Sequence, residues 1–258
     1  MNFSIVNEVQ FLAFWLAFSR WIGVMINIPL FDNSAVPFMT QILTSLILTY
    51  CFFGQVEAGL ISEIRYWGVE NLWYLTGFYT LTGLIIGYTL KIIMGIFVSA
   101  GSLMTQQMGF SSLQYFDPSY IAQIGPIENL IKWTLTILIL TSGALLPIFK
   151  GTLDSFAAFN LSNLANLAKP AHFYYDFFKS LVLTSLLLSS PILFSNLLLN
   201  MVLGIVARTV PQMNILMVSF VVNIGIGLVV FMAISEEFFF VAYETYVKKL
   251  GEWFTFIT

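Results

Sequence analysis

The chain has 258 residues, of which 59% are apolar and only 9% are charged, and its formal net charge is −3. Soluble domains average about 25% charged residues, so this composition, with a mean hydropathy of +0.89, excludes a soluble globular protein and indicates a polytopic membrane protein. The charge balance favours no nucleic-acid partner, and the single cysteine, Cys51, excludes an internal disulfide and a cysteine-based metal site.

The first apolar run is predicted to be a helix over Val9–Leu30. It contains Arg20, Gly23 and Asn27, whose spacing of three and then four residues places them on one helical stripe. A charged side chain in an apolar helix is expected to face other protein rather than lipid. The alternative is that the long Arg20 side chain snorkels to a membrane interface.

A second span-length run covers Phe38–Gln55, with Pro37 suited to the first turn of the helix. The following segment, Val56–Asn71, holds four charged residues and is therefore predicted to be a solvated connection. Tyr66 and Trp67 in it are candidate anchors at a membrane interface.

The third run, Leu72–Ala100, would be about 43 Å long as one helix, which exceeds the roughly 30 Å of a bilayer core. Small residues share one slowly drifting face with Lys91, and a face of this kind lets a neighbouring backbone approach closely. The neighbour could be another subunit or another helix of the same chain. The residues of this face are Thr76, Thr80, Gly83, Gly87, Lys91 and Gly95.

Hydrophobicity falls over Ser99–Asn129, and Gly109–Phe116 is predicted to be a loop held between helices. Asp117-Pro118 and Gly125-Pro126 both have the pattern of a helix start. A loop at membrane depth is tolerated only inside protein or along an aqueous path.

Leu130–Phe149 is predicted to be a further span, and Lys150–Lys179 a mixed connection in which Phe156–Leu167 could form a short amphipathic helix. His172 is the only histidine, so it is interpreted as a surface residue and not as a ligand or base.

The long apolar run Ser180–Ala207 contains Pro191, which predicts a kink. Beyond it, a short polar break precedes a last span at Asn214–Ile234 and a tail that is helical at its start. The break contains Arg208, Pro211, Gln212 and Asn214. It is interpreted either as the tip of a helical hairpin, with Pro211 opening the second helix, or as an ordinary loop between two spans.

The sequence contains no nucleophile elbow, Walker loop, metal-ligand set or paired intramembrane carboxylates. We therefore expect no enzymatic activity and no cofactor.

Several stretches, in order along almost the whole chain, resemble the FliR family of flagellar type III export-gate proteins, which has a counterpart family in virulence secretion systems. They are Arg20-Trp-Ile-Gly23 with Pro29 and Pro37, Gln107-Met108-Gly109-Phe110 leading to Phe116-Asp117-Pro118, Leu153-Asp154-Ser155-Phe156, and the sequence ARTVPQMN at 207–214. One departure is Gly143-Ala144, where many relatives carry a histidine.

The resemblance implies an all-α export-gate domain over residues 1–258, built from helical hairpins. It implies a FliP-like part over 1–179, with a central plug loop at about 101–118, and a FliQ-like hairpin and tail over 180–258. The implied function is a structural and gating subunit that forms, with FliP and FliQ, the channel for unfolded substrates. The implied partners are FliP-like and FliQ-like subunits, an FlhB-like protein, export substrates and membrane lipid, in the bacterial inner membrane at the flagellar basal body.

Two sets of site residues follow from the motifs and the resemblance together. Deformable apolar side chains beside a glycine suit a seal against ions, and the matching segment plugs the gate in relatives. The predicted seal is Met104, Met108, Gly109, Phe110, Tyr115 and Phe116. The predicted subunit interface is Arg20, Gly83, Gly87, Lys91, Arg208, Pro211, Gln212 and Asn214.

The competing hypothesis is a small-molecule secondary transporter, in which Pro191 and Pro211 would break helices near the middle of the membrane. The sequence shows no convincing inverted repeat or cluster of binding groups in favour of it. The motifs favour a flagellar over a virulence system without deciding between them.

Overall fold

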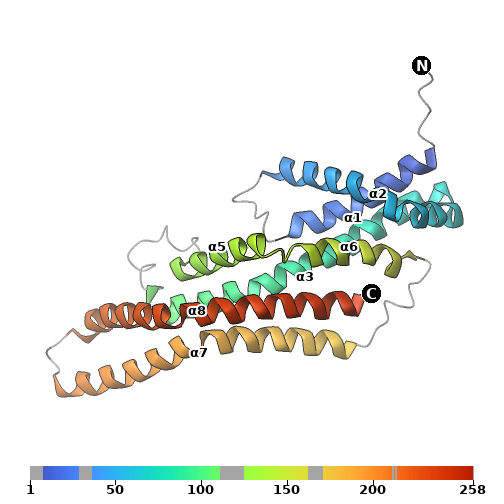
Figure 1. The fold of residues 1–258 in the computed structure, drawn as a ribbon. Helices are drawn as coiled ribbons and strands as arrows, with labels where there is room; N and C mark the ends of the chain where they lie inside the picture. Colours follow the sequence, from blue (N-terminus) through green and yellow to red (C-terminus); the bar gives the residue numbers. More distant parts are fainter. Residues whose placement is uncertain are drawn as a thin grey trace. The chain divides into compact units, whose positions relative to one another are not determined.

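The computed structural model describes residues 8–28, 37–110, 125–161, 171–210, 212 and 214–257. All the regular elements in these ranges are helical (Figure 1). In chain order they are α1 (Glu8–Asn27), α2 (Phe38–Trp67), the short 3₁₀ helix η2 (Val69–Asn71), α3 (Leu72–Gln107), α5 (Pro126–Thr141), α6 (Leu146–Ala158), α7 (Ala171–Thr209) and α8 (Ile215–Ile257). The all-helical prediction is confirmed for this part of the chain.

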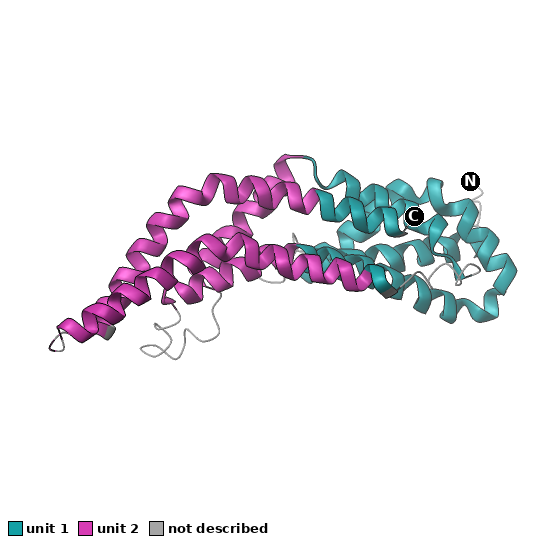
Figure 2. Ribbon diagram, turned by 90° about the horizontal axis from the view of Figure 1, so that it is seen from below, with its two compact units in different colours: residues 1–93, 143–173, 248–258 teal, residues 94–142, 174–247 magenta. Residues whose placement is uncertain are grey.

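The chain forms two compact units that interleave along the sequence (Figure 2). Unit 1 contains residues 1–93, 143–173 and 248–258, and unit 2 contains residues 94–142 and 174–247. The predicted boundary between residues 179 and 180 falls inside α7. The likeness of the two sequence halves to FliP and FliQ stays a prediction.

Unit 1 is built on two close helix contacts. α1 packs along α2, and α1 crosses α3 where glycines of both helices meet. A Cβ added at Gly23 would lie 2.9 Å from the Thr80 carbonyl oxygen, and one added at Gly87 would lie 2.6 Å from the Val24 carbonyl oxygen. The small-residue face of α3 therefore packs against α1. Of the two neighbours that the sequence left open, another subunit or another helix of the same chain, the structure shows the second.

α2 does not end near Gln55, because the helix continues to Trp67. The predicted solvated connection over 56–71 is therefore wrong for most of its length. The reason is that this part of α2 carries an inward face, on which Leu60, Glu63 and Ile64 are buried. Two charged residues of this part also contact other helices, because Glu57 accepts a hydrogen bond from the Gln10 side chain of α1 at 2.8 Å and Glu63 accepts one from Tyr79 of α3. The charges of this segment therefore do not indicate a solvated connection.

The predicted span over Leu130–Phe149 is not one straight helix, although the two helices that replace it could together form one bent span. α5 ends at Thr141, α6 begins at Leu146, and the two helices are bent by 73°. Gly143 lies in the break with a φ of 76°, a left-handed backbone conformation that glycine adopts without steric cost. α6 also includes the start of the predicted 156–167 helix, whose residues beyond 161 lie outside the described ranges.

Unit 2 contains most of the hairpin formed by α7 and α8. Pro191 lies inside α7 without ending it, and Figure 1 shows this helix changing direction partway along. α8 begins at Ile215, so Pro211, which lies outside the described residues, does not open it. The tail, predicted to be helical at its start, continues α8 to Ile257.

Five of the described helices are long and apolar enough to cross a membrane, or six spans if the bent α5–α6 pair counts as one. Their faces are covered very unequally. About 56% of the apolar window of α3 is buried within the chain, compared with 28% for α7 and 11% for α8. The chain is therefore a membrane protein whose C-terminal hairpin leaves most of its apolar surface uncovered.

Candidate functional site

Arg20, in the middle of α1, is completely buried in unit 1. Its guanidinium donates hydrogen bonds to the Ser155 hydroxyl at 3.3 Å and to the Phe159 carbonyl at 2.8 Å, at the C-terminal end of α6. The same group lies 4.4 Å from the centre of the Tyr79 ring and 4.3 Å from that of Phe156. Cation–π contacts and charge-assisted hydrogen bonds are strongest when water is excluded, so this arginine ties α1 to α3 and α6.

Glu63 of α2 is the acidic member of the same cluster and is 6% exposed. Its carboxylate accepts a hydrogen bond from the Tyr79 hydroxyl and another from the Leu161 backbone N–H at 2.7 Å, and it interacts electrostatically with Arg20. A buried carboxylate is tolerated when donors and an opposite charge surround it. α1, α2, α3 and α6 thus meet at one polar centre within the apolar core of unit 1.

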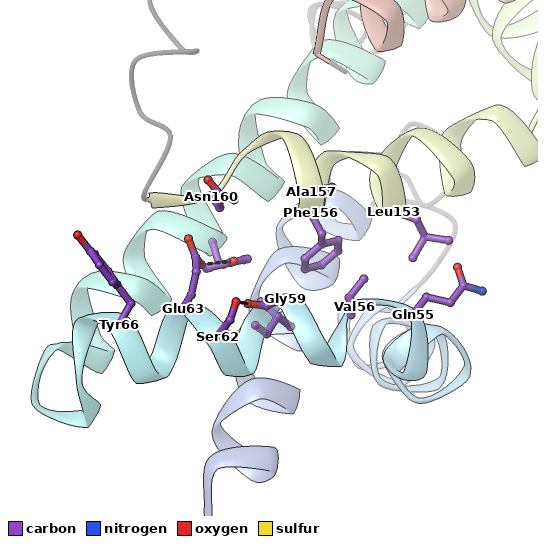
Figure 3. Close-up of a pocket in the computed structure, with 12 residues that line it drawn as sticks. Gln55, Val56, Gly59, Ser62, Glu63, Tyr66, Leu153, Phe156, Ala157 and Asn160 are labelled. Carbon is purple, nitrogen blue, oxygen red and sulfur yellow. Dashed lines mark hydrogen bonds between the residues drawn. The ribbon is translucent and has the colours of Figure 1, made fainter.

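A pocket of about 560 Å³ adjoins this centre. Figure 3 shows Glu63 and Tyr66 projecting from α2, with Phe156 and Leu153 on the α6 side of the pocket. The pocket wall combines a carboxylate, two tyrosines and amide groups, but no nucleophile with an adjacent base. Within the described ranges, no three histidine, cysteine, aspartate or glutamate residues are grouped to hold a metal ion.

The predicted seal lies at the end of α3 in unit 2. α3 ends at Gln107, and Gly109 has a φ of 86°, which turns the chain out of the helical path. Met104 and Met108 are fully buried by their own chain, whereas Phe110 is half-buried. Tyr115 and Phe116 lie outside the described residues.

The start of α5 lies against the end of α3 in unit 2. Gly125 is the N-cap of α5, and it lies against Thr105, since a Cβ there would be 3.0 Å from the threonine hydroxyl. One turn further into α3, Gly101 lies against the backbone of Glu128. The start of α5 therefore packs on the last two turns of α3.

The predicted interface residues divide into buried and exposed groups. Arg20, Gly83 and Gly87 are enclosed within unit 1, so the structure assigns them to contacts inside the chain and not to a surface open to another subunit. The exposed ones are Lys91, Arg208, Gln212 and Asn214, and Pro211 is not described. Asn214 caps α8, because its side-chain oxygen accepts from the Met217 N–H at 3.4 Å.

Sequence reasoning placed Arg20 correctly against protein but missed its surroundings. Glu63 was assigned to a solvated connection, and Tyr79 was not singled out. A signal was present, because Leu60, Glu63 and Ile64 follow a helical spacing that continues the preceding span. Asn196 is not among the predicted site residues, yet its side chain donates a hydrogen bond to the end of α3.

The sequence family described as bacterial export proteins, family 1, matches residues 11–248. The flagellar biosynthetic protein FliR of Bacillus subtilis is 28% identical over 234 residues, covering 90% of this chain and 89% of that protein. FliR of Aquifex aeolicus is 22% identical over 266 residues, covering 95% and 98%. The Yop proteins translocation protein T of Yersinia pestis is 23% identical over 159 residues, covering 61% of each chain.

Proposed function

We propose that this chain, which belongs to the bacterial export proteins, family 1, is a structural and gating subunit of a flagellar type III export gate. In this proposal the chain forms, with FliP-like and FliQ-like subunits, the channel through which unfolded substrates cross the bacterial inner membrane at the flagellar basal body. An FlhB-like protein associates with that channel. The observation that carries the proposal is the family match over almost the whole chain, together with the coverage of the flagellar relatives.

The uncovered C-terminal hairpin supports a role in an assembly. Apolar side chains more than half exposed occur on both of its helices, among them Leu187, Phe194, Met201, Val229 and Met232. Surfaces of this kind need lipid or protein partners. The exposed Arg208 and Gln212 at the hairpin tip, together with Lys91, supply polar contacts for neighbouring subunits.

The end of α3 supports the gating part of the proposal. A channel for an unfolded polypeptide must close when idle, because each unit charge that crosses 100 mV releases about 2.3 kcal/mol. Met104 and Met108 anchor the helix end in unit 2, and Phe110 starts the segment that we assign to the seal. Apolar side chains at a constriction exclude ions by dewetting.

Copurification tests the assembly. The tagged chain, expressed with its genomic FliP-like and FliQ-like neighbours, should purify with both and should support export of a flagellar substrate in a deletion strain. A chain that is stable alone and retains no neighbour would contradict the proposal and favour the transporter hypothesis. Arg208→Leu should weaken assembly and export, whereas exposed Ser190→Ala on the same helix should leave both unchanged.

Ion leak tests the gate. Deletion of residues 110–115 should leave the complex assembled but let ions through it, and a cysteine at Phe110 should crosslink to a pore-lining residue of a neighbouring subunit in the closed state. The Cys51→Ser background provides a cysteine-free chain for this test. An assembled deletion complex with the conductance of the wild type would refute the gating role.

A further inference from the structure

The last turn of α3 is bound to α7 by a buried hydrogen bond. The Asn196 side chain is completely buried, and its Nδ2 donates to the Gln107 carbonyl at 2.6 Å. Carbonyl groups at the end of a helix have no partner within the helix, so an external donor satisfies a group that would otherwise be unpaired. The bond therefore fixes the place at which α3 ends.

The next residue is held by α8. Met108 is fully buried, and a Cβ added at Gly227 would overlap its side chain, so Gly227 forms the recess that receives this methionine. No other residue type fits this recess without displacing Met108. The end of α3 is thus held from two sides, by a donor on α7 and by a recess on α8.

Both contacts lie at one level of the hairpin. Asn223 donates to the Asn200 side-chain oxygen at 3.3 Å, which sets Asn200 opposite Asn223 in the antiparallel pair. Asn196 precedes Asn200 by one turn and Gly227 follows Asn223 by one turn, so Asn196 and Gly227 also lie opposite each other. The residue after Met108 is Gly109, where the chain turns out of the helix.

We propose that Asn196 and Gly227 are positioning residues that fix the end of α3 on the α7–α8 hairpin and thereby set the positions of Gly109 and Phe110, where the proposed seal begins. The link to the seal, which is the second clause of this proposal, rests on the proposed function. The fixed position of the α3 end, which is the first clause, does not. Since the hairpin has most of its apolar surface uncovered, a subunit that binds it would change the position of Phe110 through these two contacts.

The first clause is tested by distance measurements on the assembled complex. Spin labels at Gln106 and Met201, both exposed, report the position of the α3 end relative to α7 in the Cys51→Ser background. Asn196→Leu keeps a similar volume without the donor and should shift or broaden the distance distribution. Ser189→Ala should leave it unchanged, because that buried hydroxyl bonds only within α7.

Gly227→Ala should produce the same shift through steric overlap with Met108. The double variant Gly227→Ala/Met108→Ala should return the distribution toward that of the wild type, because it removes the Met108 Cγ, which would overlap the new methyl group, and keeps only the Cβ at 3.3 Å. This rescue distinguishes a specific contact from general loss of folding. Wild-type distributions in both Asn196→Leu and Gly227→Ala would overturn the inference.

Ion leak through the same complexes tests the second clause. Asn196→Leu and Gly227→Ala should leak and the rescued double variant should not. If the distances shift without leak while the 110–115 deletion leaks, the two residues do not set the gate and the second clause falls. If the deletion does not leak either, the gating function itself falls, and the measured distances still support the first clause.

Discussion

Gly87→Ala is the substitution whose outcome the structure specifies in most detail. The added Cβ would lie 2.6 Å from the Val24 carbonyl oxygen, 2.9 Å from the Asn27 Cβ and 3.0 Å from the Gly23 carbonyl oxygen. Two of these three atoms belong to the backbone of α1, so no side chain can rotate away to make room for the methyl group. α1 and α3 must move apart.

The size of the effect follows from that movement. Ordinary contact for a Cβ begins at 3.4 Å, so the helices must separate by about 1 Å at the crossing. Overpacking of a well-packed site costs about 1–3 kcal/mol, and a loss of about 2 kcal/mol lowers Tm by about 4–8 °C for a chain of this length. In an exposed helix the same substitution stabilises by up to about 1 kcal/mol.

Thermal unfolding of the purified protein in detergent is the assay, and Gly77→Ala is the matched control. Gly77 lies in the same helix and in the same unit, and a Cβ added there meets nothing within 4 Å. Gly87→Ala should melt several degrees lower than the wild type, and Gly77→Ala at or above the wild type. Equal Tm values for the two variants would refute the close packing of α1 on α3.

Three further predictions concern buried polar groups and a helix cap. Arg20→Leu should lower the free energy of unfolding by about 2–4 kcal/mol, because the Phe159 carbonyl loses its donor and Glu63 loses its cation. The amount of protein in the membrane should therefore fall below that of the variant Arg208→Leu, which changes an exposed arginine. Equal amounts of the two variants would contradict this prediction. Tyr79→Phe should lower stability by about 1–3 kcal/mol, since Glu63 loses one donor, and Glu63→Gln should partly restore it in a double-mutant cycle. Asn214→Ala should cost about 1 kcal/mol in thermal unfolding and Asn214→Asp much less, because only the latter keeps the capping oxygen.

The sequence predicted the parts of the fold that depend on local pattern. The start of α5 after Gly125, the end of the α3 helix before Gly109 and the long hairpin with Pro191 inside one arm all follow from helix signals. The protein-facing position of Arg20 also follows, because a charge inside an apolar run has few acceptable environments.

The remaining features depend on partners that are distant in the sequence. Glu63 looks solvated until Tyr79 and the end of α6 surround it, and no spacing within α2 reveals those neighbours. The small-residue face of α3 indicates close approach without saying which helix approaches, and the answer is α1. The bend at Gly143 lies in a run whose apolar residues are equally compatible with a straight span.

The interleaving of the two units has a consequence for biogenesis. Unit 1 includes residues 248–258, and the Phe254 ring fills the space left open by Gly151, while Phe256 stacks on Phe173 with ring centroids 3.7 Å apart. During translation, α6 and the start of α7 are therefore made well before the residues of α8 that pack against them. Loop closure over so many residues adds little to the equilibrium cost but delays the final contact. Until the ribosome has delivered the last turns of α8, the faces of α6 and α7 around Gly151 and Phe173 must be covered by lipid, an insertase or a chaperone.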